Sequence, residues 1–363
     1  MTSPSRPLRD RTGVLAHPAV SAVEVLRAVR RVARENLPLL FVSVAYFAGA
    51  RVVQAIVGTP VAEPSLRYPG SLAIYPYLLL VAAGTFWAGL WQVPQGQRAK
   101  AALDRAAMLG LVLIVIPFVL NTYGDWKLAI PVLRPFVWDT RLAALDRAVH
   151  FGHDPWRLLQ PLLGYPRVTW WLDYAYLLWF PVTSFALIWQ WCSGHRLDRA
   201  RYLLAYVLVH VILGTAAALG FSSAGPCYYR FVAGSGATDP YAGLFAYLER
   251  VNTATPLLAL QGQAALWRNY ATMRGADFLG ISAMPSVHLA VATLVALAAW
   301  RAKRAAGWVF AGFAGITLIG SVHLGWHYAV DGYAAIAGAG IIWWASGLFL
   351  RRYFEAAGIS AED

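Results

Sequence analysis

The chain has 363 residues, of which 59% are hydrophobic and only 13% are charged, with a mean hydropathy of +0.51. This composition lies outside the range of soluble domains and indicates a protein embedded in a membrane. The formal net charge of +12 does not indicate a nucleic-acid partner, because the basic residues stand between apolar runs instead of forming one basic patch. The first 30 residues also lack the apolar core and cleavage site of a signal peptide.

A basic leader precedes the first apolar run. Residues 1–36 intersperse arginines with apolar residues, a pattern typical of a helix that lies along a membrane surface. We expect this leader to lie on the cytoplasmic surface. Its arginines are Arg6, Arg9, Arg11, Arg27, Arg30, Arg31 and Arg34.

Runs of about 20 apolar residues recur along the chain, long enough to cross a hydrocarbon core of roughly 30 Å. We expect about eight transmembrane helices, each bounded by proline, glycine or a cluster of charges. Their predicted ranges are 37–58, 72–93, 106–121, 168–192, 200–221, 284–301, 305–323 and 327–350. The predicted fold class is therefore an all-α integral membrane protein, and no internal repeat is evident.

Four parts are predicted: the leader over 1–36, a three-span extension over 37–121, a membrane domain with the polar motifs over 122–350, and a tail over 351–363. The membrane domain includes two long outer segments, 122–167 and 222–283, in which apolar residues recur at helical spacing. Such short amphipathic helices either lie on the membrane surface or pack on one another as a cap. The apolar residues are Trp138, Leu142, Leu145 and Val149 in the first segment and Tyr241, Leu244, Phe245, Leu248 and Val251 in the second.

Basic residues gather in the short loops on one side of this predicted topology. The positive-inside rule assigns that side to the cytoplasm, so both termini are cytoplasmic and the two long segments are extracytoplasmic. In a bacterium this would be the inner, or plasma, membrane. Cys192 and Cys227 fall on opposite sides, so we expect no disulfide between them.

A histidine and an aspartate stand four residues apart where the last predicted span begins. A helix that starts there would place His327 and Asp331 on one face. The carboxylate can then accept one imidazole N–H and leave the other ring nitrogen as a nucleophile or base. His323, four residues earlier, would face the same side. Histidine suits phosphorus chemistry, because a phosphoramidate forms and breaks without a metal.

A Pro-Ser-Val-His motif marks the start of the sixth predicted span. Pro285 suits the first position of a helix, and Ser282 or Ser286 suits its cap. The free N–H groups of such a first turn form a natural seat for a phosphate. His288 is then close enough to exchange a proton with a leaving or entering oxygen. Together with His327 on a neighbouring span, it would bracket a phosphate from both sides.

Other interpretations of the histidines stay open. A lone histidine in a helix is more often a hydrogen-bonded packing residue, and we interpret His195 and His210 in this way. His323 and His327 also have the spacing of two zinc ligands on one helical face. The chain lacks the glutamate of a His-Glu-x-x-His motif, and no cysteine lies nearby in sequence, so we favour a site without metal.

Residues 285–288 and 327–331 resemble the second and third motifs of the type-2 phosphatidic acid phosphatase superfamily. Pro-Ser-x-His and His-Tyr-x-x-Asp are typical of a branch that includes fungal inositol phosphorylceramide synthase and its bacterial relatives. The segments from Asp139 to Pro155 and from Leu172 to Tyr174 resemble an upstream part of that branch. The resemblance covers about residues 135–350 and implies a six-helix type of phosphatase or phosphotransferase core.

The resemblance also implies a role for each matching residue. His327 would be the nucleophile that takes the phosphoryl group, and Asp331 its orienting partner. His288 would protonate the leaving alcohol and then deprotonate the acceptor. Ser286 and the backbone near it would hold phosphate oxygens, without a metal.

The cations that such a site needs are less evident. We do not recognise the superfamily's first motif, Lys-x6-Arg-Pro, and Ser321 stands where an arginine commonly precedes the nucleophile by six residues. The segment 225–230 stands where the first motif is expected, and its Arg230, next to Tyr229, is the first candidate for binding phosphate. Arg230 would otherwise extend to lipid headgroups. The further candidates are Arg268, Arg274 and His323.

These features favour a lipid phosphotransferase that moves a phospho-headgroup between lipids at the extracytoplasmic face. Its partners would be a phospholipid or isoprenoid phosphate, a lipid acceptor and the bilayer, with no cofactor and no nucleic acid. Hydrolysis of phosphatidic acid or a polyprenyl diphosphate is the alternative within the superfamily. A proton-relay transporter would instead scatter titratable residues over several spans. A non-catalytic scaffold would tolerate the loss of His327.

Overall fold

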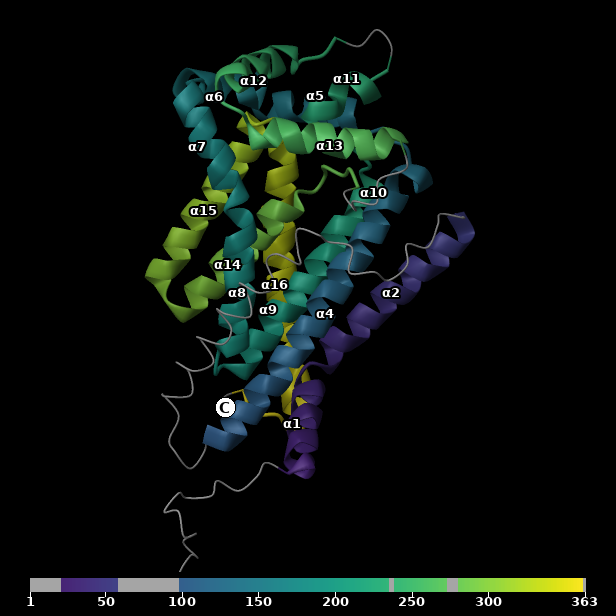
Figure 1. Ribbon diagram of the computed structural model, residues 1–363, viewed down its shortest axis with the longest axis vertical. Helices are drawn as coiled ribbons and strands as arrows, with labels where there is room; N and C mark the ends of the chain where they lie inside the picture. Colours follow the sequence, from purple (N-terminus) through teal and green to yellow (C-terminus); the bar gives the residue numbers. More distant parts are fainter. Residues whose placement is uncertain (1–20, 58–97, 235–237, 273–279, 362–363) are drawn as a thin grey trace, which may run out of the picture.

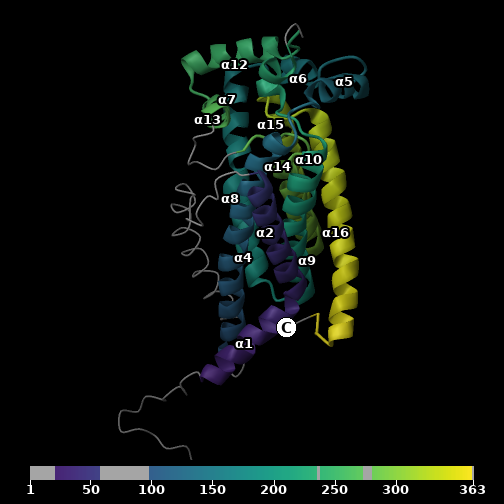
Figure 2. The same ribbon diagram turned by 90° about the vertical axis from the view of Figure 1, so that its right-hand side faces the viewer.

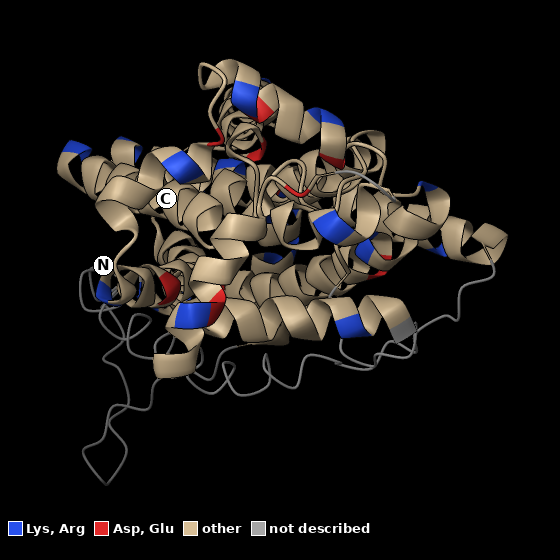
Figure 3. Ribbon diagram, turned by 90° about the horizontal axis from the view of Figure 1, so that it is seen from above, with Lys and Arg blue, Asp and Glu red and all other residues tan. Residues whose placement is uncertain are grey.

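The computed structural model describes residues 21–57, 98–234, 238–272 and 280–361, and these ranges contain helices and no strand (Figure 1). Long helices run side by side, and short helices cross one end of the bundle (Figures 1 and 2). Six of the described helical stretches are long and apolar enough to cross a membrane. Seen along the long axis, acidic and basic residues are sparse on the ribbon (Figure 3). The predicted all-α membrane fold is confirmed.

The first helices form one edge of the bundle. α1 (Ala22–Glu35) begins after its N-cap Ser21, which exchanges hydrogen bonds with Glu24. α2 (Leu37–Val57) and α4 (Arg98–Leu133) run in the same direction. Arg31, shortly before α2, pairs with Asp104 near the start of α4, and Arg51 of α2 pairs with Asp125 further along α4. The predicted span 72–93 lies outside the described residues.

Helix α4 is longer than the span predicted at 106–121. The apolar run is interrupted by Asp125 and Lys127, yet the helix continues to Leu133. Asp125 is accommodated because it pairs with Arg51 of α2, which removes much of the cost of a charge within the bundle. The first outer segment therefore begins after Leu133, and not at residue 122.

The next two predicted spans are each interrupted. Residues 168–192 form α7 (Pro166–Leu177) and α8 (Trp179–Cys192). Pro181, in the first turn of α8, has no N–H to donate to the carbonyl four residues earlier, so the helical ladder breaks there. The span predicted at 200–221 begins earlier. It consists of α9 (Arg196–Leu208), the π-helical η2 (Val209–Ala217) and α10 (Ala218–Gly220).

The last three long helices are α14 (Val287–Ala302), α15 (Arg304–His323) and α16 (Ala329–Ala357). The 16 residues of α14 extend over about 24 Å, less than the hydrocarbon core of a bilayer. α14 lies in the middle of the bundle, and most of its residues between 289 and 295 are at most 1% exposed. α16 continues past the predicted end at 350 and stops before Gly358, which has the left-handed φ of 61° typical of a helix end.

Short helices cover one end of the bundle, and we call them the cap (Figure 1). They share a buried apolar cluster with residues 322–330, which include the third motif. Leu142 of the first outer segment and Leu244 and Leu248 of the second lie in this cluster, so the helices pack on one another as a cap. Not all of the apolar residues predicted at helical spacing are buried, because Leu145 and Val149 are exposed. The cap consists of α5 (Asp139–Val149), α6 (Pro155–Leu163), η3 (Pro226–Tyr228), α11 (Tyr229–Val232), α12 (Ala242–Ala254) and α13 (Leu258–Thr272).

The opposite end, which we call the base, holds α1 and the end of α16 (Figures 1 and 2). The Tyr353 hydroxyl donates to the Arg34 carbonyl at 2.6 Å. Glu35 pairs with Arg196 and Arg199 at 3.0 and 3.2 Å, which fixes the start of α9 at the same end. Both described ends of the chain therefore lie at the base.

Candidate active site

The third motif lies in the connection between α15 and α16. α15 ends at His323, and the chain turns at Gly325, whose φ is 73° and where a Cβ would lie 2.6 Å from the Phe245 ring. The backbone N–H groups of Trp326 and His327 both donate to the Ser321 carbonyl, at 2.8 and 3.2 Å. His327 is thus in a loop and not on a helix. The prediction that His323 and His327 share a helical face is wrong, because the chain reverses between them.

His327 and Asp331 nevertheless form the predicted pair. Nδ1 of His327 lies 3.3 Å from Oδ2 of Asp331, and the backbone N–H of Tyr328 donates to the same oxygen at 3.0 Å. Asp331 is in the first turn of α16 and fully buried, while His327 is 8% exposed. The carboxylate holds Nδ1, so Nε2 is the ring nitrogen left to react.

The second motif lies at the start of α14, where Ser286 is the N-cap and accepts the Leu289 N–H at 3.4 Å. Pro285 therefore precedes the helix, which corrects its predicted place at the first helical position. The backbone N–H of Ser286 donates to the Asp331 carbonyl at 3.3 Å. This bond joins the beginnings of α14 and α16, and it brings the two motifs together at the cap end.

An aromatic wall surrounds His288, the second residue of α14. Tyr176 of α7 stacks between His288 and Trp326, with ring centroids 5.5 and 6.3 Å apart. Trp179 of α8 packs on His288 at 4.3 Å, and its indole N–H donates to the His288 carbonyl at 2.7 Å. We did not single out these rings in the sequence. The only signal was that Tyr176 and Trp179 follow Asp173 by three and six residues, just after the Leu172–Tyr174 segment that resembles the superfamily.

Buried carboxylates position the two motifs. Asp146 of α5 accepts the N–H groups of Ala329 and Val330 at 3.0 and 2.9 Å, which caps α16 beside Asp331. Asp173 of α7 accepts two N–H groups at the start of α13, those of Leu258 and Ala259, and so ties the cap to the bundle. Burial raises the pKa of Asp146 to about 6, although these N–H groups oppose the shift.

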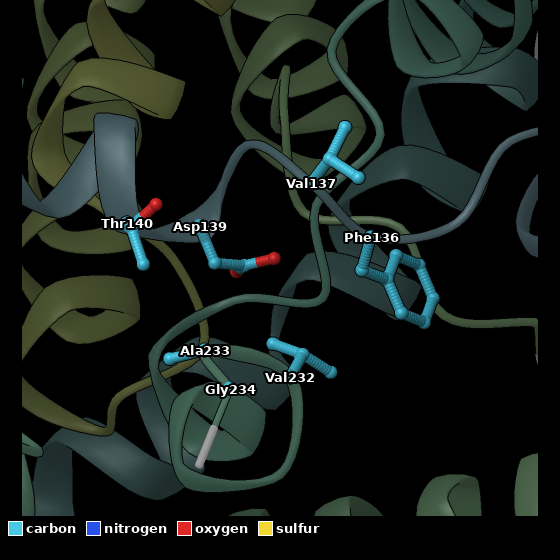
Figure 4. Close-up of a pocket in the computed structure, with 7 residues that line it drawn as sticks. All are labelled: Phe136, Val137, Asp139, Thr140, Val232, Ala233 and Gly234. Carbon is cyan, nitrogen blue, oxygen red and sulfur yellow. The ribbon is translucent and has the colours of Figure 1, made fainter. Parts of the chain in front are cut away.

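Asp139 of α5 also accepts hydrogen bonds from backbone N–H groups, and it lines a pocket of about 270 Å³ (Figure 4). Its oxygens accept the N–H groups of Ala224 and Gly225 at 2.9 and 2.8 Å and the Tyr328 hydroxyl at 2.8 Å. Burial raises its pKa to about 6. Protein donors occupy this carboxylate, and no residue of the second or third motif lines the pocket.

The predicted phosphate ligands are held in different ways. Arg230 is exposed and lies over the Phe231 ring at 4.6 Å, whereas Tyr229 is buried against Tyr241. His323 is fully buried, and its Nε2 lies 2.9 Å from the Thr169 hydroxyl. Arg268 is exposed on α13, and Arg274 lies outside the described residues. Their roles in phosphate binding stay predictions.

No group of three potential metal ligands is present among the described residues.

Lys127 is a cation that sequence reasoning missed. It lies near the end of α4, and its charge is close enough to act on both His288 and His210. The Lys-x6-Arg-Pro pattern is in fact present, as Lys127, Arg134 and Pro135, which corrects our statement that it is not recognisable. It was missed because the third span was predicted to end at 121 and the pattern was sought after the fifth span. Arg134 is exposed, 3.5 Å from the Leu219 carbonyl.

These features define a protein whose helices cross the membrane several times and whose His-Asp pair meets a second imidazole beneath a helical cap. The sequence model of the PAP2 superfamily matches residues 140–345, more than half of the chain, and the protein belongs to this superfamily. Neither a curated protein nor a solved structure matches the chain. Membership points to phosphatase or phosphotransferase activity. The matched region contains both motifs and nearly all of the cap, whereas α1, α2 and α4 with Lys127 precede it.

Proposed function

We propose that the protein is a lipid phosphotransferase in which His327 takes a phospho-headgroup from one lipid and passes it to the hydroxyl of another. The observation that carries the proposal is the bond from the Ser286 N–H to the Asp331 carbonyl. It holds the His327–Asp331 pair against the helix that bears His288. Two imidazoles can therefore act on one phosphorus from the two sides.

In the first step, Nε2 of His327 attacks the phosphorus of the donor lipid while Asp331 holds Nδ1. The bond from phosphorus to the leaving oxygen breaks, and protonated His288 gives its proton to that oxygen. In the second step, the hydroxyl oxygen of the acceptor attacks the phosphorus and the P–N bond breaks. His288 takes the hydroxyl proton and returns to its starting state.

The charge on the phosphoryl oxygens needs cations and oriented N–H groups. Lys127 is a candidate because its charge acts on His288, and the first turn of α14 supplies N–H groups beyond the Ser286 cap. Arg230 stays in the proposal as a second cation, on the basis of its place in the sequence. No step requires a metal.

Transfer is favoured over hydrolysis because aromatic rings pack around His288 and the cap packs on the segment of the third motif. Tyr176, Trp179 and Phe180 pack around this imidazole, and the cap shares its apolar cluster with residues 322–330. Hydrolysis of a lipid phosphate or polyprenyl diphosphate would use water as the acceptor in the second step. From the distribution of basic residues, we place the site on the extracytoplasmic side.

The test follows the phosphorus atom. The purified wild type is given an isotopically labelled pool of phospholipids and polyprenyl diphosphate together with diacylglycerol and ceramide, and products are identified by mass spectrometry. His327→Ala and His288→Ala should abolish turnover. His153→Ala is the matched control, because His153 is an exposed histidine in a cap turn.

Label that enters a new lipid only with the wild type and the control would support the transferase and identify donor and acceptor. Free phosphate as the sole labelled product would make the protein a phosphatase. Full turnover by His327→Ala would refute the assigned nucleophile. A folded wild type without any product would direct attention to a transporter or a scaffold.

A further inference from the structure

A second cavity lies at the base, far from both motifs. Its volume is about 420 Å³, and it lies between the end of α8, the start of α9 and the end of α14. Trp189 and Ala298 give it apolar walls. Its polar lining is Gln190, Ser193, His195, Asp198 and Arg301. We call this cavity the base pocket.

The base pocket is separate from the active site. His288 is the second residue of α14, and Arg301 lies near the other end of the same helix. Thirteen residues of α-helix separate them, which corresponds to about 20 Å. A group bound at Arg301 therefore cannot take part in chemistry at His288.

Gln190 gives the base pocket an unused acceptor. Its side chain is 3% exposed, and its Oε1 has no hydrogen-bond partner in the described part of the protein. A buried amide oxygen without a donor is costly and uncommon in folded proteins. Since Gln190 lines the cavity, a ligand that donates a hydrogen bond would satisfy this oxygen.

The surroundings of the base pocket favour an anion. Arg301 holds Asp198 through two bonds, of 2.8 and 3.2 Å, while its side chain is still 43% exposed. Arg201 is close enough for its charge to interact with Arg301, Asp198 and Arg351. This part of the base therefore holds more guanidinium groups than carboxylates, and a negative group at Arg301 would offset the excess positive charge.

We propose that the base pocket binds the headgroup of an anionic glycerophospholipid that carries a free hydroxyl beside its phosphate. The phosphate lies at Arg301, and the headgroup hydroxyl donates to Oε1 of Gln190. The apolar side of the glycerol backbone lies against Trp189 and Ala298. The lipid is a structural ligand of the base, independent of the lipid that reacts at His327.

The test measures the unfolding temperature of the purified protein in detergent as lipid is added. Phosphatidylglycerol has the required phosphate and hydroxyl, phosphatidylmethanol has the same charge without the hydroxyl, and phosphatidylcholine has no net charge. Glycerol 3-phosphate tests whether a soluble phosphate ester is sufficient. The variants are Gln190→Met and Arg301→Gln. Arg304→Gln is the matched control, because Arg304 is exposed at the same end of the bundle and does not line the pocket.

We expect phosphatidylglycerol to stabilise the wild type more strongly than the two other lipids. Arg301→Gln should weaken its apparent affinity by about tenfold or more, the effect of losing a charge-assisted hydrogen bond. Gln190→Met should remove the preference for phosphatidylglycerol over phosphatidylmethanol. Arg304→Gln should behave as the wild type, and turnover of Arg301→Gln at His327 should be unchanged.

Three results would overturn the proposal. Equal weakening by Arg301→Gln and Arg304→Gln would show general attraction to a basic surface. Unchanged affinity in both pocket variants would place the stabilising lipid elsewhere, including the active site. Equal stabilisation by glycerol 3-phosphate would make the ligand a soluble ester and not a lipid. Each variant is compared with its own lipid-free unfolding temperature, so a general loss of stability does not imitate any of these results.

Discussion

At the scale of single residues, one carboxylate oxygen of Asp331 interacts with two groups. Oδ2 is near Nδ1 of His327 and accepts the Tyr328 N–H. Asp331→Asn keeps the size and one acceptor oxygen, so the start of α16 should be preserved. It loses the negative charge that offsets the positive charge developing on the His327 ring as the P–N bond forms, and kcat should fall by a factor on the order of 10³.

The measurement is turnover of Asp331→Asn with the lipid pair identified by the phosphorus assay. Asp239→Asn is the control, because among the described residues the Asp239 side chain accepts a single hydrogen bond, from the nearby N–H of Tyr241 in the cap. Turnover of Asp331→Asn within twofold of the wild type would show that Asp331 shapes the helix start without orienting the nucleophile.

At the scale of elements, the segment before η3 approaches the third motif closely. Gly225 has a φ of 101°, and a Cβ there would lie 2.8 Å from the Trp326 carbonyl oxygen. Gly225→Ala should therefore lower the free energy of unfolding by about 1–3 kcal/mol and also displace the residue before His327. Gly152→Ala is the control, because its φ of 86° is similar but no atom lies within 4 Å of its Cβ position. Both variants should unfold at lower temperature than the wild type, and only Gly225→Ala should lose turnover. Equal turnover in the two variants would contradict this close contact.

The carboxylates of α5 predict how stability depends on pH. Burial raises the pKa of Asp139 and Asp146 to about 6, whereas the unfolded chain titrates near 3.8. Between these pH values the folded protein binds more protons than the unfolded chain, so stability increases as the pH falls through this window. From pH 7 to pH 5 the gain should be on the order of 1 kcal/mol for each carboxyl. Asp146→Asn should reduce the increase in unfolding temperature over this range, and an unchanged increase would contradict the raised pKa of Asp146.

The sequence predicted the long elements and both motifs, because hydropathy and motif spacing are local properties. It failed where distant residues decide the structure. The third span was predicted to end before Asp125, yet the helix continues past it, because Asp125 pairs with Arg51, 74 residues away in the sequence. His327 was placed on a helix because a spacing of four suits a helix, whereas its bonds to Ser321 form a loop. Lys127 was overlooked because it lies in the part of α4 that the prediction assigned to an outer segment.

At the scale of the whole molecule, the superfamily region and the preceding helices contribute different parts of one site. Residues 140–345 provide both motifs, the aromatic wall and nearly all of the cap. α4 precedes this region and adds Lys127, whose charge acts on His288. The cap, in turn, is tied to the bundle by Asp173, whose oxygens hold the first N–H groups of α13 at 2.6 and 2.9 Å. Asp173 bonds the start of α13 and none of the side chains of His327, Asp331 and His288, so it is the residue at which the cap can be loosened.

This arrangement predicts that the cap controls the choice between transfer and hydrolysis. Asp173→Ala removes both bonds at the start of α13 but no hydrogen bond of His327, Asp331 or His288. Water should then reach the proposed phosphohistidine intermediate more easily, and the ratio of free phosphate to transferred product should increase severalfold. Asp239→Ala serves as the control, because it removes a carboxylate whose hydrogen bond, within the described residues, is to the cap itself. A fall in both products with an unchanged ratio would mean that the cap supports the fold without excluding water. An increased ratio in Asp173→Ala alone would show that exclusion of water by the cap makes the protein a transferase.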